Sequence, residues 1–186
     1  MNLHTVGELV RARAAGEKVD YLWFWGHQPE SSGRIGPSCL SQWWPAPFTV
    51  DGLNFATAEH YMMWGKAMVF GDSENAEQVL AAATPKEAKA IGRRVRGFDT
   101  QLWATHRFET VVVGNVAKFG QHPPLLDYLL GTGDQVLVEA SPVDRIWGIG
   151  LAASDPRAED PTKWAGLNLL GFALMETRDR LRHARE

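Results

Sequence analysis

Helix-start signals recur through the middle of this chain and leave room for only short strands between them. Thr57 and Asp99 each stand in the position of an N-cap, ahead of "AEHYMMWGK" and "TQLWATHRF". The segment "TPKEAKAIG" places Thr84, Pro85 and Glu87 at N-cap, N1 and N3, a capping box with proline at its preferred position. The predicted helices cover about residues 57–70, 84–93 and 99–119.

Further helices and a few short strands are predicted on either side. Helical patterns cover about 5–15, "PPLLDYLLGTG" as far as Gly131, and 166–183. The strand candidates are "DYLWFWG" (20–26, as a buried strand), "QVLVEAS" (135–141) and a hairpin over 47–57, whose Asp-Gly pair is a type I′ turn signal. Long loops are expected at 27–39 and 153–164, and 143–151 is expected to be a glycine-containing loop or an irregular strand. The pattern predicts a mainly helical α+β fold without βαβ alternation.

Length and charge narrow the class of protein. A chain of 186 residues is expected to form one domain, with residues 1–19 as a helical extension and the core over about 20–183. A formal net charge of −3 argues against a broad nucleic-acid surface. It leaves room for a local phosphate pocket, and the basic residues Lys86, Lys89, Arg93, Arg94 and Arg96 are close together in sequence.

The sequence also predicts a cytoplasmic protein. Its one cysteine, Cys39, excludes an internal disulfide and suits a reducing compartment. The first 30 residues lack a signal-peptide pattern, and no apolar run approaches the roughly 18 residues of a membrane span. No cofactor is expected, and the oligomeric state is not readable from the sequence.

The segment "TAEHYMMWGK" carries the first candidate site. On a helix, Glu59 and Lys66 lie on one stripe with two methionines between them, about 10 Å apart along the axis, so both side chains can reach one small ligand. The ordinary alternative is that Glu59 only complements the helix dipole. His60 beside Glu59 invites a metal interpretation, but no HExxH spacing or second clustered ligand supports it, so no metal site is predicted.

The second candidate site is the glycine-rich stretch "EASPVDRIWGIG". Here Asp144 can accept a hydrogen bond from a hydroxyl group, and Trp147 can stack on a base. Arg145 can bind phosphate, and Gly148 lets the backbone approach a ligand closely. A surface turn is the alternative for any one of these residues alone. Asn168, in "GLNLLG", is either a helix cap or a ligand-binding amide, and the cap is slightly favoured.

Two further residues are assigned to substrate binding from the segment "GRRVRGFDTQLW". Arg93 ends a helix, where a cation favours the dipole in any case, and its functional interpretation is a phosphate clamp. Trp103 lies in the first turn of the next helix and is either a core residue or a stacking wall. Eight tryptophans in one chain suit a pocket that holds flat rings, and Trp43 joins the candidates.

These segments together resemble the NADAR (YbiA-like) family, in order, from about Tyr21 to Leu181. Single motifs are weak, but the ordered set is highly specific. The phrases that carry it are "FWG" (24–26), "WWPAPFTVDGLNFATAEHYMMWGK" (43–66), "ATPKEAKAIGR" (83–93), "KFGQHPPLLDYLLGTGDQVLVEASPVDRIWGIG" (118–150) and "GLNLLGFALMETRDRL" (166–181).

The resemblance implies an N-glycosidase with a compact, mainly helical α+β domain. Some members of the family cleave ribose from heterocycles in early riboflavin intermediates, and others remove ADP-ribose from guanine in nucleic acid. The family's catalytic Glu falls on Glu59, its pocket Trp on Trp103, the acidic residue of its DxxW motif on Asp144, and the Lys after EHY on Lys66. The partner it implies is a ribosyl or ADP-ribosyl small molecule, or else ADP-ribosylated nucleic acid. The sequence does not choose between them.

The chemistry implied is stabilisation of an oxocarbenium-like ribose as the base departs. Glu59 would stabilise that charge and activate water, or protonate the leaving nitrogen if burial raises its pKa. Lys66 would either orient the ribose or form a Schiff base with its opened aldehyde. Two departures from the family, the longer 27–39 loop and Gln42-Trp43 in place of Asn-Phe, leave the substrate open. The competing hypothesis is a module that binds ADP-ribose or a nucleotide without cleavage.

Overall fold

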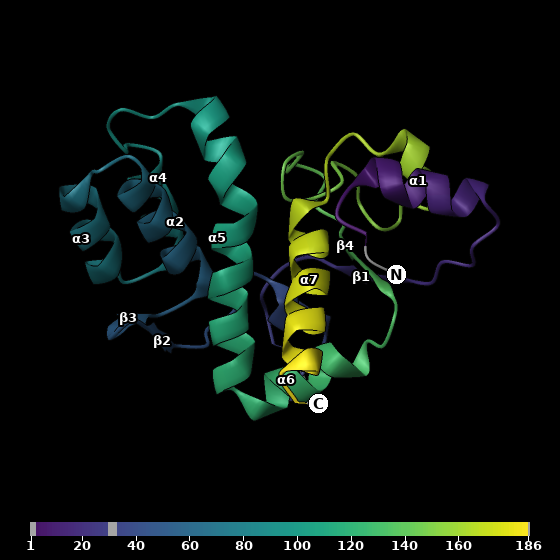
Figure 1. The fold of residues 1–186 in the computed structure, drawn as a ribbon, viewed down its shortest axis with the longest axis horizontal. Helices are drawn as coiled ribbons and strands as arrows, with labels where there is room; N and C mark the ends of the chain where they lie inside the picture. Colours follow the sequence, from purple (N-terminus) through teal and green to yellow (C-terminus); the bar gives the residue numbers. More distant parts are fainter. Residues whose placement is uncertain (1–2, 30–32, 186) are drawn as a thin grey trace. The chain divides into compact units, whose positions relative to one another are not determined.

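The structure is a computed structural model that describes residues 3–29 and 33–185. Residues 30–32 of the predicted 27–39 loop lie outside the described residues, as do the first two residues of the predicted extension. Contacts divide the chain into two compact units: unit 1 is Met1–Ser41 with Pro124–Glu186, and unit 2 is Gln42–Pro123. Seven α-helices and four short strands in the described residues (Figure 1) confirm the mainly helical α+β class.

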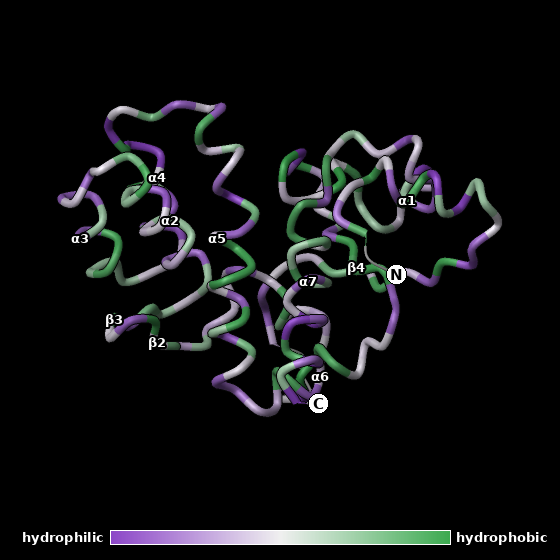
Figure 2. The backbone as a smooth tube through the Cα atoms, viewed as in Figure 1, coloured by the Kyte–Doolittle hydropathy of each residue, from purple (hydrophilic) through white to green (hydrophobic). Residues whose placement is uncertain are grey.

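Unit 1 is built on two parallel strands that are far apart in sequence. β1 (Tyr21–Phe24) pairs with β4 (Val136–Glu139), with Tyr21 opposite Val136 and Phe24 opposite Glu139. α7 (Leu169–His183) packs on β4, whose hydrophobic residues are coloured green in Figure 2. The remaining elements of unit 1 are α1 (Val6–Ala14), α6 (Pro123–Gly131) and the 3₁₀ helices η1 (Pro37–Leu40) and η2 (Pro161–Lys163).

Unit 2 is a hairpin followed by four helices. The hairpin pairs β2 (Phe48–Val50) with β3 (Leu53–Phe55), and the φ values of Asp51 and Gly52, 49° and 80°, are positive as a type I′ turn requires. Its buried face meets Tyr61 in an aromatic core. The helices are α2 (Ala58–Val69), α3 (Ser73–Ala81), α4 (Pro85–Gly92) and α5 (Thr100–Gln121), and the first three stand together in Figure 1.

The capping signals placed most helix starts correctly. Thr57, Thr84 and Asp99 are the N-caps of α2, α4 and α5. The capping box of α4 is incomplete, however, because the carboxylate of Glu87 accepts from the backbone N–H of Ala83 instead of that of Thr84. The reciprocal bonds of a full capping box occur at α1 instead.

Several elements differ from the sequence prediction. α3 was not predicted, although Asp72 caps it by accepting from the backbone N–H of residue 75. β1 is shorter than the predicted 20–26, and three of its four residues are only half-buried because the pair has just two strands. The loop predicted at 153–164 contains η2, and α7 begins at Leu169, three residues later than predicted.

Candidate functional site

Glu59 is held in the first turn of α2 with its side chain inside the protein. The residue is only 2 % exposed. Its backbone N–H donates to the carbonyl oxygen of Gln42 at 3.0 Å, and Thr57 caps the turn by accepting from the next N–H along. A carboxylate buried at a helix N-terminus acts in a low dielectric, where its influence on a nearby positive charge exceeds that of a solvated one.

Buried amides support the segment that precedes α2. The Gln42 side chain donates through Nε2 to Oδ1 of Asn115 on α5, at 3.1 Å, and both residues are buried. The Asn115 amide in turn donates to the carbonyl of Val111. Asn115 was not predicted as a site residue, although an amide within the largely apolar run "VVVGNVAKF" is a signal for a buried hydrogen-bonded group.

Lys66 lies at the other end of α2 and is engaged with α4. Its ammonium donates to the carbonyl oxygen of Gly92 at 2.7 Å and lies 4.1 Å from the ring centre of Phe98. Burial lowers the pKa of Lys66. Met63, on the same stripe of α2, packs against Gly92 so closely that a Cβ there would come within 2.1 Å of the methionine sulfur.

The packing of α2 on α5 shows where Trp103 lies relative to Glu59. Gly114 faces Tyr61 and Gly65 faces Thr110, so the two helices run antiparallel. Trp103, about two turns before Thr110, therefore lies toward the C-terminal end of α2, whereas Glu59 lies at its start. Trp103 is a buried residue, 9 % exposed. Unit 2 thus does not place Glu59 and Trp103 at the same end of α2.

The basic residues at the end of α4 and just after it differ in whether they form ion pairs. Arg96 pairs with Asp72 at 2.6 Å and with Glu74 at 3.2 Å, and this pairing lowers the pKa of Asp72. Arg93 is the exposed C-cap residue of α4, directly after the carbonyl that Lys66 contacts. Arg96 therefore has a structural role, while Arg93 remains a candidate for phosphate.

Trp43 is half-buried and carries a cation near its ring. The Nζ atom of Lys89 on α4 lies 5.9 Å from the centre of that ring. An indole with a neighbouring ammonium suits a flat ring attached to a phosphate.

In unit 1 the loop after β4 is folded around Asp144. One oxygen of its carboxylate accepts from the backbone N–H groups of Ile146 and Trp147, both at 2.8 Å. The hydroxyl of Ser141 accepts from the backbone N–H of Asp144, and the carbonyl of Asp144 accepts from the N–H of Gly150. Asp144 therefore shapes the loop in addition to any contact that it makes with a ligand.

The other predicted residues of this loop lie beside one another. Arg145 is exposed, Trp147 is half-buried, and Gly148 is packed so that a Cβ would come 2.8 Å from the carbonyl oxygen of Glu139. The backbone carbonyls of Arg145 and Gly148 accept from residues 167 and 168, so the loop is fixed against the start of α7. The glycine is needed for this close approach.

Asn168 corrects an expectation. It stands at the N-cap position of α7 with φ of 52°, but its side chain makes no capping bond. Instead its amide oxygen accepts from the N–H of Glu139 and its amide nitrogen donates to the carbonyl of Leu137, both at 2.9 Å. The residue is fully buried. Because β4 uses both ends of the amide, Asn168 ties α7 to the strand instead of capping the helix.

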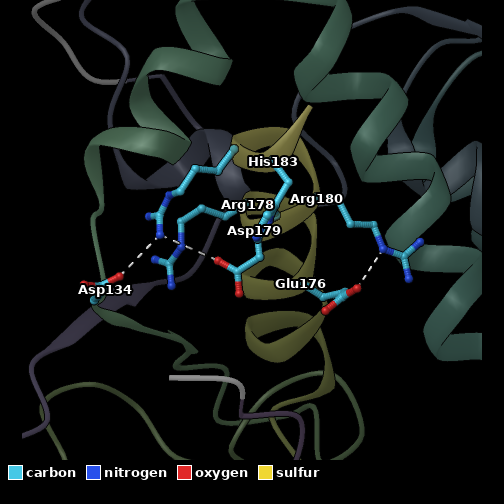
Figure 3. Close-up of a pocket in the computed structure, with 7 residues that line it drawn as sticks. Asp134, Glu176, Arg178, Asp179, Arg180 and His183 are labelled. Atoms are coloured by element: carbon cyan, nitrogen blue, oxygen red, sulfur yellow. Dashed lines mark hydrogen bonds and ion pairs between the residues drawn. The ribbon is translucent and has the colours of Figure 1, made fainter. Parts of the chain in front are cut away.

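A cavity of about 670 Å³ lies beside the C-terminal end of α7 (Figure 3). It is lined by Asp134 and by residues of the last two turns of α7. Two ion pairs hold charges of its lining, Arg180 to Glu176 at 2.7 Å and Arg182 to Asp134 at 3.5 Å. None of the predicted site residues lines it, and its balanced ion pairs indicate a solvated groove.

Within residues 3–29 and 33–185, no group of three or more His, Cys, Asp and Glu side chains is placed to hold a metal ion. In the same ranges, no helix combines the length and the hydropathy of a membrane span.

Known proteins match most of the chain. The sequence profile described as NADAR domain matches residues 23–182. N-glycosidase R617 of Acanthamoeba polyphaga mimivirus is 41 % identical over 168 residues, which are 88 % of this chain and 97 % of the viral protein. The riboflavin biosynthesis protein PYRR of Zea mays is 33 % identical over 139 residues, 70 % of this chain but 20 % of that longer protein.

One solved structure supports the fold. The NMR structure of the Escherichia coli protein YbiA superimposes with a TM-score of 0.69 and 27 % sequence identity, covering 90 % of this chain and 88 % of that one.

Proposed function

Because the chain belongs to the NADAR family and is an N-glycosidase, we propose that it hydrolyses the C–N bond between ribose and the heterocycle of a ribosylamino-pyrimidine phosphate. The name of the maize relative, a riboflavin biosynthesis protein, supports this substrate class. So does the net charge of −3, which favours a small ligand over a nucleic-acid backbone. Water supplies the new C1 hydroxyl, and the amino-pyrimidine leaves with a proton.

The observation that carries the proposal is the burial of Glu59. As the C–N bond stretches, positive charge develops on C1 and the ring oxygen of the ribose. A carboxylate that is 2 % exposed, anchored through its backbone to Gln42, would stabilise that charge with little reorganisation. The same carboxylate would then take the proton of the attacking water.

The other predicted residues are assigned supporting roles within their own units. In unit 2, Trp43 would contact the base and Arg93 the phosphate, while Trp103 lies at the other end of α2 from Glu59 and is given no contact with this base. The roles expected in unit 1 stay predictions from the sequence: Asp144 as an acceptor for hydroxyls, Trp147 as a stacking indole and Arg145 as a phosphate-binding guanidinium. Lys66 would either orient the ribose or form an imine with its opened C1 aldehyde.

A second candidate substrate is ADP-ribose attached to guanine. The exposed side chains of Arg93 and Arg94, together with Lys89 above the ring of Trp43, favour it because a pyrophosphate offers more anionic oxygens than one phosphate. The scissile bond is again between ribose C1 and a ring or exocyclic nitrogen, so Glu59 keeps the same role.

A substrate panel tests the proposal. The full-length protein is incubated with ribosylamino-pyrimidine phosphate, with ADP-ribosylated guanosine and with ADP-ribosylated DNA, and the released base and sugar are quantified by mass spectrometry. We expect Glu59→Gln to lose more than about 100-fold in kcat/KM, roughly 2.7 kcal/mol of transition-state stabilisation. Glu77→Gln, an exposed change on α3, is the matched control and should retain full turnover.

Two outcomes would contradict the assignment. If Glu59→Gln stays within about threefold of the wild type, roughly 0.65 kcal/mol, Glu59 is not catalytic. If calorimetry detects binding of ADP-ribose while none of the three substrates is cleaved, this chain is a binding module. Thermal denaturation of each variant separates loss of catalysis from loss of fold.

A further inference from the structure

A cavity of about 410 Å³ lies where the two parallel strands of unit 1 end. Trp23, Phe24 and Trp25 line it from the end of β1, and Ala140 lines it from the residue after β4. The strand ends are tied together there, because the N–H of Ala140 donates to the carbonyl of Phe24 at 2.9 Å. The space beyond the carboxyl ends of parallel strands is a common place for ligands.

The same cavity receives both ends of the loop that carries Asp144. The loop leaves β4 at Ala140, and its far end returns to line the cavity with Ala152, Ala153 and Ser154. Between these ends the N–H of Ile149 donates to the carbonyl of Glu139, which holds the loop against the strand. The walls are therefore preformed, as small-molecule sites usually are.

The lining specifies the chemistry of a ligand. Among the residues that the structure describes, it contains two indoles, a phenyl ring, three alanine methyls and one hydroxyl, that of Ser154, and no charged side chain. Trp25 is 60 % exposed, which leaves a large apolar surface in water beside the cavity. A flat, uncharged ring would cover that indole, and the volume is within the range of sites for small ligands.

We propose that this Trp25 cavity binds the uncharged base of a nucleoside, stacked on Trp25 with its edge against the hydroxyl of Ser154. This proposal goes beyond the N-glycosidase proposal and does not depend on the role given to Glu59. A bound base would bridge the two ends of the Asp144 loop, because Ala140 and residues 152–154 both line the cavity.

Binding of adenosine to the full-length protein tests this inference. Calorimetry measures the dissociation constant, and mass spectrometry checks that adenosine stays intact during the measurement. Trp25→Ala should weaken adenosine binding by about tenfold or more, within the range that a lost base–aromatic stack costs. Trp25→Phe keeps an aromatic face and should stay within about threefold. Val143→Ala removes another exposed apolar side chain of unit 1 and should change nothing.

AMP separates base recognition from phosphate recognition. Because no charged residue lines the Trp25 cavity, AMP should bind within about threefold of adenosine. The inference is overturned if adenosine does not bind at millimolar concentration, or if Trp25→Ala binds it as the wild type does. It is also overturned if AMP binds more than about tenfold tighter than adenosine, since the phosphate would then direct binding elsewhere. Trp25 is exposed, so its variants should fold, and circular dichroism checks this.

Discussion

Lys66 and Gly92 are joined by a 2.7 Å hydrogen bond, in which the ammonium donates to the backbone carbonyl. The same ammonium lies 4.1 Å from the ring of Phe98, and burial lowers its pKa. The lysine that the family resemblance assigns to catalysis is therefore also a tie between α2 and the end of α4.

Lys66→Met should destabilise the protein whatever its catalytic role. The change leaves the carbonyl of Gly92 without this donor, and the free energy of unfolding should fall by about 1.5–3 kcal/mol, the usual range for a hydrogen bond with a charged partner. Urea denaturation measures it, with the exposed Lys86→Met on α4 as control.

Borohydride added during turnover decides between the two catalytic roles, since a covalent adduct on Lys66 indicates an imine and its absence leaves only orientation of the ribose.

Gly92→Ala should disrupt the contact between α4 and α2. The new Cβ would come within 2.1 Å of the sulfur and 2.9 Å of Cγ in Met63, so the methionine must move. We expect a loss of about 1–3 kcal/mol in unfolding free energy, as for other overpacked sites. Gly131→Ala is the matched control, because nothing lies within 4 Å of its added Cβ, and it should be neutral or slightly stabilising. Equal stability of both variants would show that Met63 adjusts freely.

His60 should make stability depend on pH below neutrality. It is 1 % exposed, its Nδ1 lies 2.8 Å from the hydroxyl of Thr57, and its Nε2 lies 3.1 Å from the carbonyl of Ala82. Burial lowers its pKa from the ordinary 6.5, so the folded state binds this proton less readily than the unfolded chain. The contribution of His60 to the free energy of unfolding is therefore fully present above about pH 6.5. It declines as the pH falls toward the pKa of the folded state, by at most about 1.4 kcal/mol per pH unit.

Urea denaturation from pH 7.5 to 5 checks that slope. His60→Gln should flatten it, and His106→Gln, at an exposed position of α5, should leave it in place. A wild-type slope unchanged by His60→Gln would assign it to another group.

Asn168→Ala should cost stability, and its effect on turnover should follow from the loss of fold. The change leaves the N–H of Glu139 and the carbonyl of Leu137 without their partners inside the protein. We expect about 2–4 kcal/mol, the combined cost of two unsatisfied buried groups. Asn168→Gly accepts the φ of 52° without strain but loses the same bonds, so it should also be unstable. A stable Asn168→Ala with a raised KM would restore the ligand-binding interpretation.

Local chemistry accounts for what the sequence predicted well. Thr57 and Asp99 mark helix starts because a side-chain oxygen can satisfy an N–H only a few residues away. Asp51-Gly52 forms its turn because both residues tolerate positive φ. Each of these signals involves neighbours in sequence, so one chain was enough to find it.

Long-range partners account for what it missed. Nothing in "DYLWFWG" indicates that β1 pairs in parallel with β4, a strand that follows unit 2 in the sequence. The helix after Asp72 was not predicted because its buried residues are only Asn75, Ala76 and Val79, so no large apolar side chain marks its inner face. Asn168 looked like a cap because it precedes a helix, whereas its true partners belong to a distant strand.

The interrupted connectivity of unit 1 has a consequence for synthesis on the ribosome. Unit 2 is one uninterrupted piece of chain, so its hairpin and helices can assemble as soon as they emerge. β1 appears first but has to wait for β4, and its edge stays unpaired while everything between them is translated. Trp23 and Trp25 belong to this early segment, which makes it the part of the nascent protein most in need of protection by a chaperone.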